Sequence, residues 1–507
     1  MLTYSLGDRG EESLYGYLYR RIKEDIESGA IPAGERLPSK RALAEHLGVS
    51  LVTVEGAYGQ LVAEGYVSAK PRRGFFANPV DRPATRPRRS APVAAPAVHG
   101  PVAAGVAHGS AWPPAASAEK PLLADFTGGE VAAELFPYRA WARAMRDVLS
   151  HEPERALLCE SPSMGSVRLR EALAAHLRSF RGMEADPACI VVGAGAQTLY
   201  NLLVQLLGRG RRFAVEDPGY PRLTSIYRAN DVELSHVPLD GAGIGMAALR
   251  SSGASVAHLV PSHQFPTGLV TSVSRRYELL GWANDAEGRY VVEDDYDCEF
   301  RLAGRPIPSM QSIDASERVI YANTFARSMG PAFRVGYLVL PAHLARRFQS
   351  ELGFYSCTVS SMEQLALARF IEGGDFERHV RRMRTHYRAL RDRLLAALSD
   401  GPWGDRLRVE GADAGLHFLL RVDSAATEAD LVRAARAEGV ALAPLSAFRQ
   451  ASVGSGRCAG AFGEGGAPSF VMSYAGVGRD VVPHAVRALE RAFDAAEREA
   501  ARAGARR

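Results

Sequence analysis

The chain has 507 residues, too many for one ordinary domain, so we expect two or three domains. Its composition, 47% hydrophobic and 23% charged residues, is typical of a soluble globular protein. A formal net charge of +4 is too small to indicate a polyanionic partner by itself. The N-terminus has no basic segment followed by an apolar run, so we expect no signal peptide. No stretch reaches about 18 uninterrupted apolar residues, so we expect no membrane span. The five cysteines are scattered without a CxxC pair, so we expect a reduced, cytoplasmic protein with no metal site.

Three helices are predicted in the N-terminal part of the chain. Leu14, Leu18, Ile22 and Ile26 recur at i, i+4 spacing, and the stretches LPSKRALAEHLG and SLVTVEGAYGQLVAEG carry further helical patterns. A short turn at residues 48–50 joins the second and third helices. This is the arrangement of a helix-turn-helix, whose second helix enters the major groove of DNA.

A hairpin with a basic tip follows these helices. The stretch GYVSAKPRRGFFA predicts two short strands around Lys70, Arg72 and Arg73, a wing placed to contact phosphates or the minor groove. Residues 1–78 hold ten basic and ten acidic side chains, so a bare three-helix core with solvated charges would look similar. Phosphate contacts need only a few basic side chains on one face, which favours DNA binding over that alternative.

Over nearly all of residues 10–78 the sequence resembles the winged helix-turn-helix domain of the GntR family of regulators. The run SGAIPAGERLPSKRALAEHLGVSLVTVEGAYGQLVAEGYV carries the resemblance. It departs from the commonest pattern after the turn serine, where an arginine is frequent and Leu51 stands here. The resemblance implies DNA contacts from Arg41, Thr53 and Gly74. With the neighbouring basic side chains, the expected contacts are Lys40, Arg41, Thr53, Arg72, Arg73 and Gly74.

Residues 79–123 change the composition of the chain. They begin with PVDRPATRPRRSAPVAAPA, are rich in proline and alanine and show no apolar periodicity. This composition predicts a flexible linker between the N-terminal module and a much longer C-terminal block.

Five apolar runs in the C-terminal block each end in a polar or glycine-rich turn. They are CIVVGAGAQTLY, RFAVEDPGYPR, SVAHLVPSHQFPTG, RYVVEDDYDCEF and RVIYANTFARS. Near-continuous apolar strands alternating with helices predict an α/β fold, a doubly wound and mostly parallel sheet buried on both faces. Ligands of such sheets bind where the carboxyl ends of the strands meet, so we expect these turns to form one small-molecule site.

The turn residues suggest the chemistry of that ligand. Ala196 and Gln197 open a helix whose N–H groups and dipole suit a phosphate, and Arg334 adds a charge-assisted contact. Tyr220 offers a flat face for stacking, and Asp294 can pair with a protonated ring nitrogen. A phosphate, a stacked ring and a carboxylate partner together describe pyridoxal phosphate.

The order of EDPGYPR, PSHQFPTG, EDDYDCEF and TFARSMGPAFRVGY resembles a fold-type-I aminotransferase domain over residues 124–495, and the whole chain resembles the MocR/PdxR-like regulators. The resemblance implies a large domain at 124–345 and a smaller α+β domain at 346–507. It also implies a head-to-tail homodimer, with each DNA module over the partner's large domain. The implied cofactor contacts are Ala196, Gln197, Thr324 and Arg334 at the phosphate, Tyr220 on the ring, Asp294 at its nitrogen and Tyr296 at its phenolic oxygen. Arg222 corresponds to a residue that binds an effector carboxylate in some relatives.

Arg327 stands where the family has the lysine that holds the cofactor covalently. The only lysines of the chain are Lys23, Lys40, Lys70 and Lys120, so the aminotransferase-like part has none after residue 120. Covalent attachment needs a neutral primary amine, and a guanidinium stays protonated and cannot supply one. We therefore expect no catalytic residue and no transaminase activity.

Several hypotheses remain open from the sequence. The favoured one is a DNA-binding transcriptional regulator that senses pyridoxal phosphate or another small anionic ligand without a covalent bond. The alternatives are an aminotransferase with an appended DNA-binding domain, and a ligand-independent regulator that uses a dead enzyme fold as its dimer interface. Arg327 is then a cation retained for the ligand, the product of drift after binding was lost, or a partner of Asp294 that closes the pocket.

Overall fold

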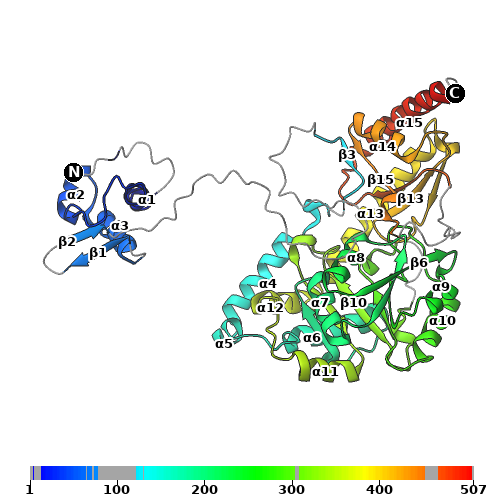
Figure 1. The fold of residues 1–507 in the computed structure, drawn as a ribbon, viewed down its shortest axis with the longest axis horizontal. Coiled ribbons are helices and arrows are strands. Elements are labelled where there is room, and N and C mark those ends of the chain that lie inside the picture. Colours follow the sequence, from blue (N-terminus) through cyan, green and yellow to red (C-terminus); the bar gives the residue numbers. More distant parts are fainter. Residues whose placement is uncertain are drawn as a thin grey trace, which may run out of the picture. The chain divides into compact units, whose positions relative to one another are not determined.

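The computed structural model describes residue 4 and residues 13–63, 66–70, 74–77, 121–128, 131–302, 308–450 and 466–504. The chain divides into two compact units, residues 1–113 and 114–507 (Figure 1). The predicted linker lies outside the described residues as far as residue 120, and so do the predicted DNA contacts Arg72 and Arg73. Among the described residues, no helix combines the length and the apolar character needed to cross a membrane.

The N-terminal unit has the predicted three helices and hairpin. These are α1 (Leu14–Ser28), α2 (Lys40–Leu47), α3 (Leu51–Ala63), β1 (Val67–Lys70) and β2 (Gly74–Ala77). Ser13 and Ser39 cap the first two helices through their hydroxyls, and Gly48 ends α2 in the left-handed conformation at φ +65°. Ser50 Oγ then accepts from the Thr53 N–H at 3.2 Å at the start of α3. The tight turn between α2 and α3 therefore depends on Gly48 and Ser50, as the sequence predicted.

One apolar core holds this unit together. Ile22, Leu43, Val54 and Leu61 are fully buried, and so is Tyr58, whose hydroxyl donates to the Pro38 carbonyl at 2.9 Å. Because these residues come from all three helices, the core fixes how α3 is presented to solvent. The predicted winged helix-turn-helix is confirmed.

The C-terminal unit is built on an eight-stranded sheet in the order β4-β11-β10-β9-β8-β5-β6-β7. The strands are β4 (Ile190–Gly193), β5 (Arg212–Asp217), β6 (Glu233–Asp240), β7 (Gly243–Ile244), β8 (Val256–Leu259), β9 (Tyr290–Asp294), β10 (Val319–Thr324) and β11 (Gly336–Val339). Strands β10, β9, β8, β5 and β6 are parallel, while β11 is antiparallel to both β10 and β4. β4 therefore runs in the same direction as β10. The five predicted strands all end at one edge of the sheet.

Helices cover both faces of this sheet. Consecutive strand residues face opposite ways, so Val291 packs with α10 on one side while Val292 packs with α7 on the other. The helices are α4 (Tyr138–His151), α5 (Glu154–Leu158), α6 (Val167–Arg181), α7 (Ala196–Leu207), α8 (Pro221–Ala229), α9 (Met246–Ser251), α10 (Val273–Asn284), α11 (Ala342–Leu352) and α12 (Ser361–Glu372). The predicted doubly wound architecture is confirmed.

A smaller antiparallel sheet, in the order β12-β13-β16-β15, completes the unit (yellow to orange in Figure 1). Its elements are β12 (Leu407–Glu410), β13 (His417–Val422), β15 (Ala443–Pro444), β16 (Ser469–Ser473), α13 (Asp375–Ser399), α14 (Glu428–Ala437) and α15 (Val482–Gly504). β3 (Ala124–Asp125) pairs with β14 (Val440–Ala441), so the first described residues of the unit join this smaller subdomain. The boundary at residue 345 stays a prediction; α12 lies beyond it and packs against α4 and α6.

A buried ion pair ties α6 to the end of β9. Arg181 Nη2 lies 2.6 Å from Asp295 Oδ2, and the two side chains are 3% and 0% exposed. The Tyr321 hydroxyl donates to the same carboxylate oxygen at 2.9 Å.

We expect Arg181→Met to lower the free energy of unfolding by about 3–5 kcal/mol, because it leaves the Asp295 carboxylate buried without its cation. Urea unfolding of the full chain, followed by circular dichroism, measures this. Arg178→Met is the matched control, since Arg178 pairs with Glu184 on the solvent side of the same helix, with 62% and 75% of the side chains exposed. Equal losses in the two variants would contradict the prediction.

Candidate functional site

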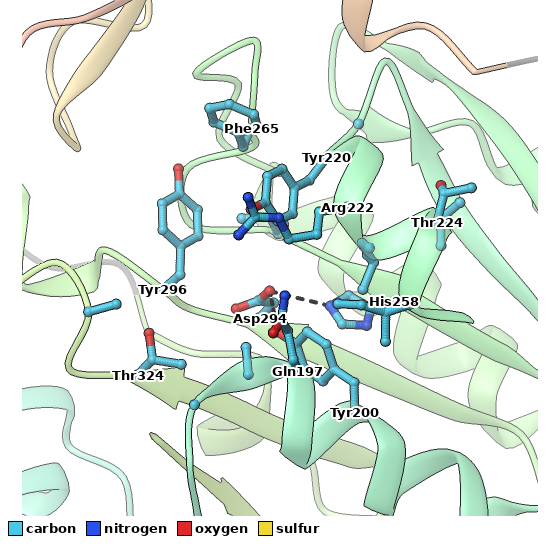
Figure 2. A pocket seen from close by; sticks show the side chains of 18 of the residues that line it. Gln197, Tyr200, Tyr220, Arg222, Thr224, His258, Phe265, Asp294, Tyr296 and Thr324 are labelled. Carbon is cyan, nitrogen blue, oxygen red and sulfur yellow. Dashed lines mark hydrogen bonds and ion pairs between the residues drawn. The ribbon is translucent and has the colours of Figure 1, made fainter. Parts of the chain in front are cut away.

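A cavity of about 430 Å³ opens at the carboxyl edge of the large sheet (Figure 2). It lies among the ends of β5, β8, β9 and β10 and the first turn of α7. The predicted residues that line it are Ala196, Gln197, Tyr220, Arg222, Asp294, Tyr296, Thr324, Arg327 and Arg334. The structure thus brings together every cofactor and effector residue expected from the sequence, and their roles toward a ligand stay predictions.

One end of the cavity is formed by the start of α7 and by Arg334. Gly195 precedes α7 with φ +79°, and a Cβ atom built there would lie 2.7 Å from Arg334 Nη2. Arg334 donates to the Ala194 carbonyl at 3.1 Å, which holds its guanidinium beside the free N–H groups of the helix. Thr324, at the end of β10, lines the same cavity. A guanidinium, a hydroxyl and a helix N-terminus together suit a phosphate group.

Asp294 lies in the middle of the pocket and is held by two neighbours (Figure 2). Its Oδ2 accepts from the Tyr200 hydroxyl at 2.6 Å and lies 3.4 Å from His258 Nε2, while the Tyr227 hydroxyl bonds His258 Nδ1 at 2.6 Å. Burial, and then the charge of Asp294, raises the pKa of Tyr200 and of Tyr227 well above the usual range of tyrosine. Both phenols therefore stay protonated and can donate. The Asp294 side chain remains 17% exposed, so this oriented carboxylate can meet a cationic N–H in the pocket.

Aromatic side chains form the side of the pocket near α8. Tyr220 caps α8 and is 45% exposed, and Phe265 meets its ring edge-on with centroids 5.7 Å apart. The Arg222 guanidinium carbon lies 6.0 Å from the centre of the Tyr220 ring. An exposed ring held in this way provides a stacking surface for a flat ligand, with a cation beside it.

Arg327 lines the pocket in the turn after β10. Its guanidinium carbon lies 5.7 Å from the centre of the Tyr296 ring. Burial, and then the charge of Asp297, raises the pKa of Tyr296 well above its usual range, and Arg327 acts in the opposite direction. Arg327 therefore supplies a positive charge to this side of the pocket; its correspondence to the lysine of aminotransferases stays a prediction.

Behind this turn, His263, Asp297 and His417 form a buried polar cluster. His263 Nδ1 lies 2.8 Å from Asp297 Oδ2, and the two imidazole rings are 4.4 Å apart. Burial, followed by the neighbouring His263 and Arg327, lowers the pKa of His417 well below its usual value. The potential ligand atoms of the three residues lie within 4.8 Å of one another. Because Arg327 disfavours a further cation and Asp297 already pairs with His263, we interpret the cluster as a polar contact between β13 and the large subdomain. The expectation of no metal stays a prediction.

Sequence reasoning missed the residues that support Asp294. Tyr200 follows Ala196 by one helical turn and so lies on the same face of α7. This spacing could have identified Tyr200 as a residue of the site. His258 interrupts the apolar run SVAHLV, and the parallel register places it beside Val292, two residues before Asp294. Tyr227 had no such signal, since it resembles any other core residue of an amphipathic helix.

In the N-terminal unit, the described DNA-contact candidates lie around α2, α3 and the wing. Arg41 is exposed, and Lys40 forms an ion pair with Glu55 at 3.4 Å. Thr53 is half-buried and its hydroxyl bonds Ser50 Oγ at 2.8 Å. Gly74 begins β2 at φ +107°, where a Cβ atom would lie 3.1 Å from Arg36 Nε. The backbone at the start of β2 therefore requires glycine.

Comparisons with known proteins place both units. Residues 126–463 match the family of class I and II aminotransferases, and residues 14–77 match the bacterial regulatory proteins of the gntR family. YdeL of Bacillus subtilis, an uncharacterized HTH-type transcriptional regulator, is 36% identical over 85% of this chain and 89% of its own length. The probable rhizopine catabolism regulatory protein MocR of Rhizobium meliloti is 33% identical over 85% and 86%. The chain belongs to the MocR/PdxR-like regulators of the GntR family.

A solved structure supports the fold of the second unit of this MocR-like regulator. The multiple substrate aminotransferase of Thermococcus profundus superposes with a TM-score of 0.64 at 25% identity, covering 75% of this chain and 93% of that one. The protein is thus a transcriptional regulator with an aminotransferase-like domain. Its GntR domain implies DNA binding, and its aminotransferase fold implies binding of pyridoxal phosphate.

The pocket also holds a carboxyl group whose pKa is raised by burial. Glu216, at the end of β5, accepts from the Val260 N–H at 3.1 Å and lies 3.4 Å from Gln264 Nε2. Burial raises its pKa from 4.5 to about 7, and the two hydrogen bonds act against this shift. The folded protein therefore holds a proton here that the unfolded chain releases at lower pH.

We expect Glu216→Gln to become more stable relative to the unsubstituted protein as pH rises from 5 to 8. The folded pKa lies above the unfolded one, so the wild-type carboxyl loses stability as pH rises toward about 7, by up to about 3 kcal/mol. Urea unfolding at a series of pH values measures the difference. Glu287→Gln, at an exposed site, is the control: its stability should follow the same pH dependence as that of the unsubstituted protein. If the stability difference between Glu216→Gln and the unsubstituted protein stays constant over this pH range, the raised pKa of Glu216 is wrong.

Proposed function

We propose that this protein regulates transcription as a homodimer whose aminotransferase-like domain binds pyridoxal phosphate, or another small anionic ligand, without a covalent bond. The observation that carries the proposal is a complete binding pocket with Arg327 in place of an amine and no lysine after residue 120. Pyridoxal phosphate, when bound covalently, supplies the electron sink of transaminase chemistry. This chain keeps the residues that would hold such a group and lacks the one that would react with it.

The residues of the pocket fit the parts of this cofactor. Gly195, Thr324 and Arg334 surround a place for the phosphate, and the exposed Tyr220 ring provides a stacking surface. Asp294, oriented by Tyr200, would accept from a protonated ring nitrogen. Arg327 would hold the far side of the ligand by charge and hydrogen bonds, because a guanidinium donates but cannot take up a proton.

Ligand binding would regulate transcription only through a difference in affinity between two arrangements of the DNA-binding and aminotransferase-like domains. The second domain would also supply the dimer contacts. Exposed apolar side chains at Tyr138, Leu158 and Phe354, 63%, 78% and 76% exposed, support this role, since they offer apolar surface that a second copy would cover.

The intact pocket favours this proposal over a relic fold. Drift after loss of binding would be expected to erode the hydrogen bonds of Asp294 and the close fit of Gly195 against Arg334, and both are present. An aminotransferase with an appended DNA-binding domain is disfavoured because no lysine is available to the pocket from its own domain.

Isothermal titration of the full chain with pyridoxal phosphate should give reversible binding that Arg334→Met weakens by about tenfold or more, because a charge-assisted hydrogen bond is lost. Arg346→Met, an exposed position on α11, is the control and should bind like the unsubstituted protein. No heat and no thermal shift with the unsubstituted protein would contradict cofactor sensing and leave the ligand-independent regulator.

Arg327→Lys should restore covalent attachment of pyridoxal phosphate, since it places a primary amine in an otherwise complete pocket. Reduction with borohydride followed by mass spectrometry of tryptic peptides would detect the adduct at position 327. Arg222→Lys offers an amine elsewhere in the same pocket and should give no adduct there. If Arg327→Lys binds the cofactor but never reacts, the turn after β10 holds its side chain away from the ligand.

A further inference from the structure

The first turn of α3 exposes two aliphatic side chains where a DNA-binding helix is often charged. Val52 is 75% exposed and Leu51 38%, both in the first turn of the helix. The opposite face is buried, with Val54 and Leu61 at 0%. Val52 therefore contributes little to the N-terminal core, while Leu51 is partly covered and partly available to a partner.

Two glycines continue this face of α3, and the fold does not require either. Gly56 and Gly59 are exposed and have ordinary helical backbone. A Cβ atom at Gly59 would meet nothing within 4 Å, and one at Gly56 would only touch Tyr15 Cδ2 at 3.6 Å. Glycine inside a helix is less favourable than alanine, so these positions lower the stability of α3 without a structural reason. Glycine does, however, let the helix backbone approach another surface closely.

The chemistry of the major groove identifies what this face can contact. The second helix of a helix-turn-helix meets base edges with its N-terminal residues, and the C5 methyl of thymine is the apolar group on those edges. Glu55, on the same face, carries a negative charge that repels phosphates even though Lys40 lies 3.4 Å away. The face is therefore suited to base edges rather than to the DNA backbone.

We propose that α3 recognises thymine through its methyl group. Val52 and Leu51 contact C5 methyls in the major groove, and Gly56 and Gly59 let the helix lie close to the base pairs. This inference rests on DNA binding by the GntR domain and adds the base that the domain selects.

The test begins with selection of binding sites for the full chain from a random duplex library. We expect the selected half-sites to contain thymine. Replacing a contacted thymine by deoxyuridine removes only the methyl group, and should weaken binding about fourfold for each methyl.

Val52→Thr keeps the branched shape and exchanges a methyl for a hydroxyl, so it should weaken binding to the thymine site. In this variant, replacing thymine by deoxyuridine should also lower the DNA affinity less than it does in the unsubstituted protein. Val273→Thr is the matched control, since Val273 is 58% exposed in the first turn of α10, in the other unit. This variant should keep the full sensitivity to deoxyuridine.

Gly59→Ala separates the effect of this glycine on helix stability from its effect on DNA binding. It should raise the unfolding temperature of the N-terminal unit, because alanine favours helix, while it weakens binding to the selected site. A variant that is more stable and binds equally well would overturn the role of this glycine.

The outcomes distinguish the inference from the function on which it rests. Selective binding that deoxyuridine leaves unchanged would overturn thymine recognition and leave DNA binding in place. Failure to select any sequence would overturn both. If Val52→Thr instead changes the oligomeric state in sedimentation, the apolar face of α3 binds protein and the inference is wrong.

Discussion

Both faces of the eight-stranded sheet are covered by helices, and this constraint determines where polar chemistry can occur in the C-terminal unit. A buried strand cannot carry unpaired polar groups, so functional side chains gather where strands end. β11 is antiparallel to its two neighbours, and this reversal keeps β4 aligned with β10. The start of α7 and the turn after β10 consequently border one cavity, although Gly195 and Phe325 are 130 positions apart in the sequence.

Arg327 lines that cavity, and the resemblance to aminotransferases places it at the lysine position. Under the proposed function it removes the amine chemistry and leaves the binding surface. Asp294 is oriented by Tyr200 and His258. The charge of Arg327 instead acts on Tyr296 and His417. Under the proposed function, a guanidinium that holds one protonation state suits a receptor better than a catalyst.

Much of this architecture could be predicted from local sequence signals. Capping serines, the turn at Gly48 and the i, i+4 apolar spacing specify the helix-turn-helix, and five strand-turn units specify the parallel sheet. Tyr227 could not be predicted as a supporting residue, because it looks like any other core residue of its helix. The cluster of His263, Asp297 and His417 could not be predicted, because its members come from distant parts of the chain. The pairing of β3 with β14 was also hidden, since two-residue strands carry no recognisable pattern. Helical spacing predicts that Val54 faces the core together with Ala57, Tyr58 and Leu61, and all four are buried. The extent to which Val52 is exposed could not be predicted from that spacing.

The close fit of Gly195 against Arg334 makes the phosphate end of the pocket depend on glycine in two separate ways. A Cβ atom at position 195 would lie 2.7 Å from Arg334 Nη2, and the backbone at φ +79° is strained for any other residue. Removing the arginine would relieve the first constraint and leave the second. A side chain at position 195 is therefore expected to be unfavourable whether or not Arg334 is present, so this corner of the pocket cannot be remodelled by changing its cation alone.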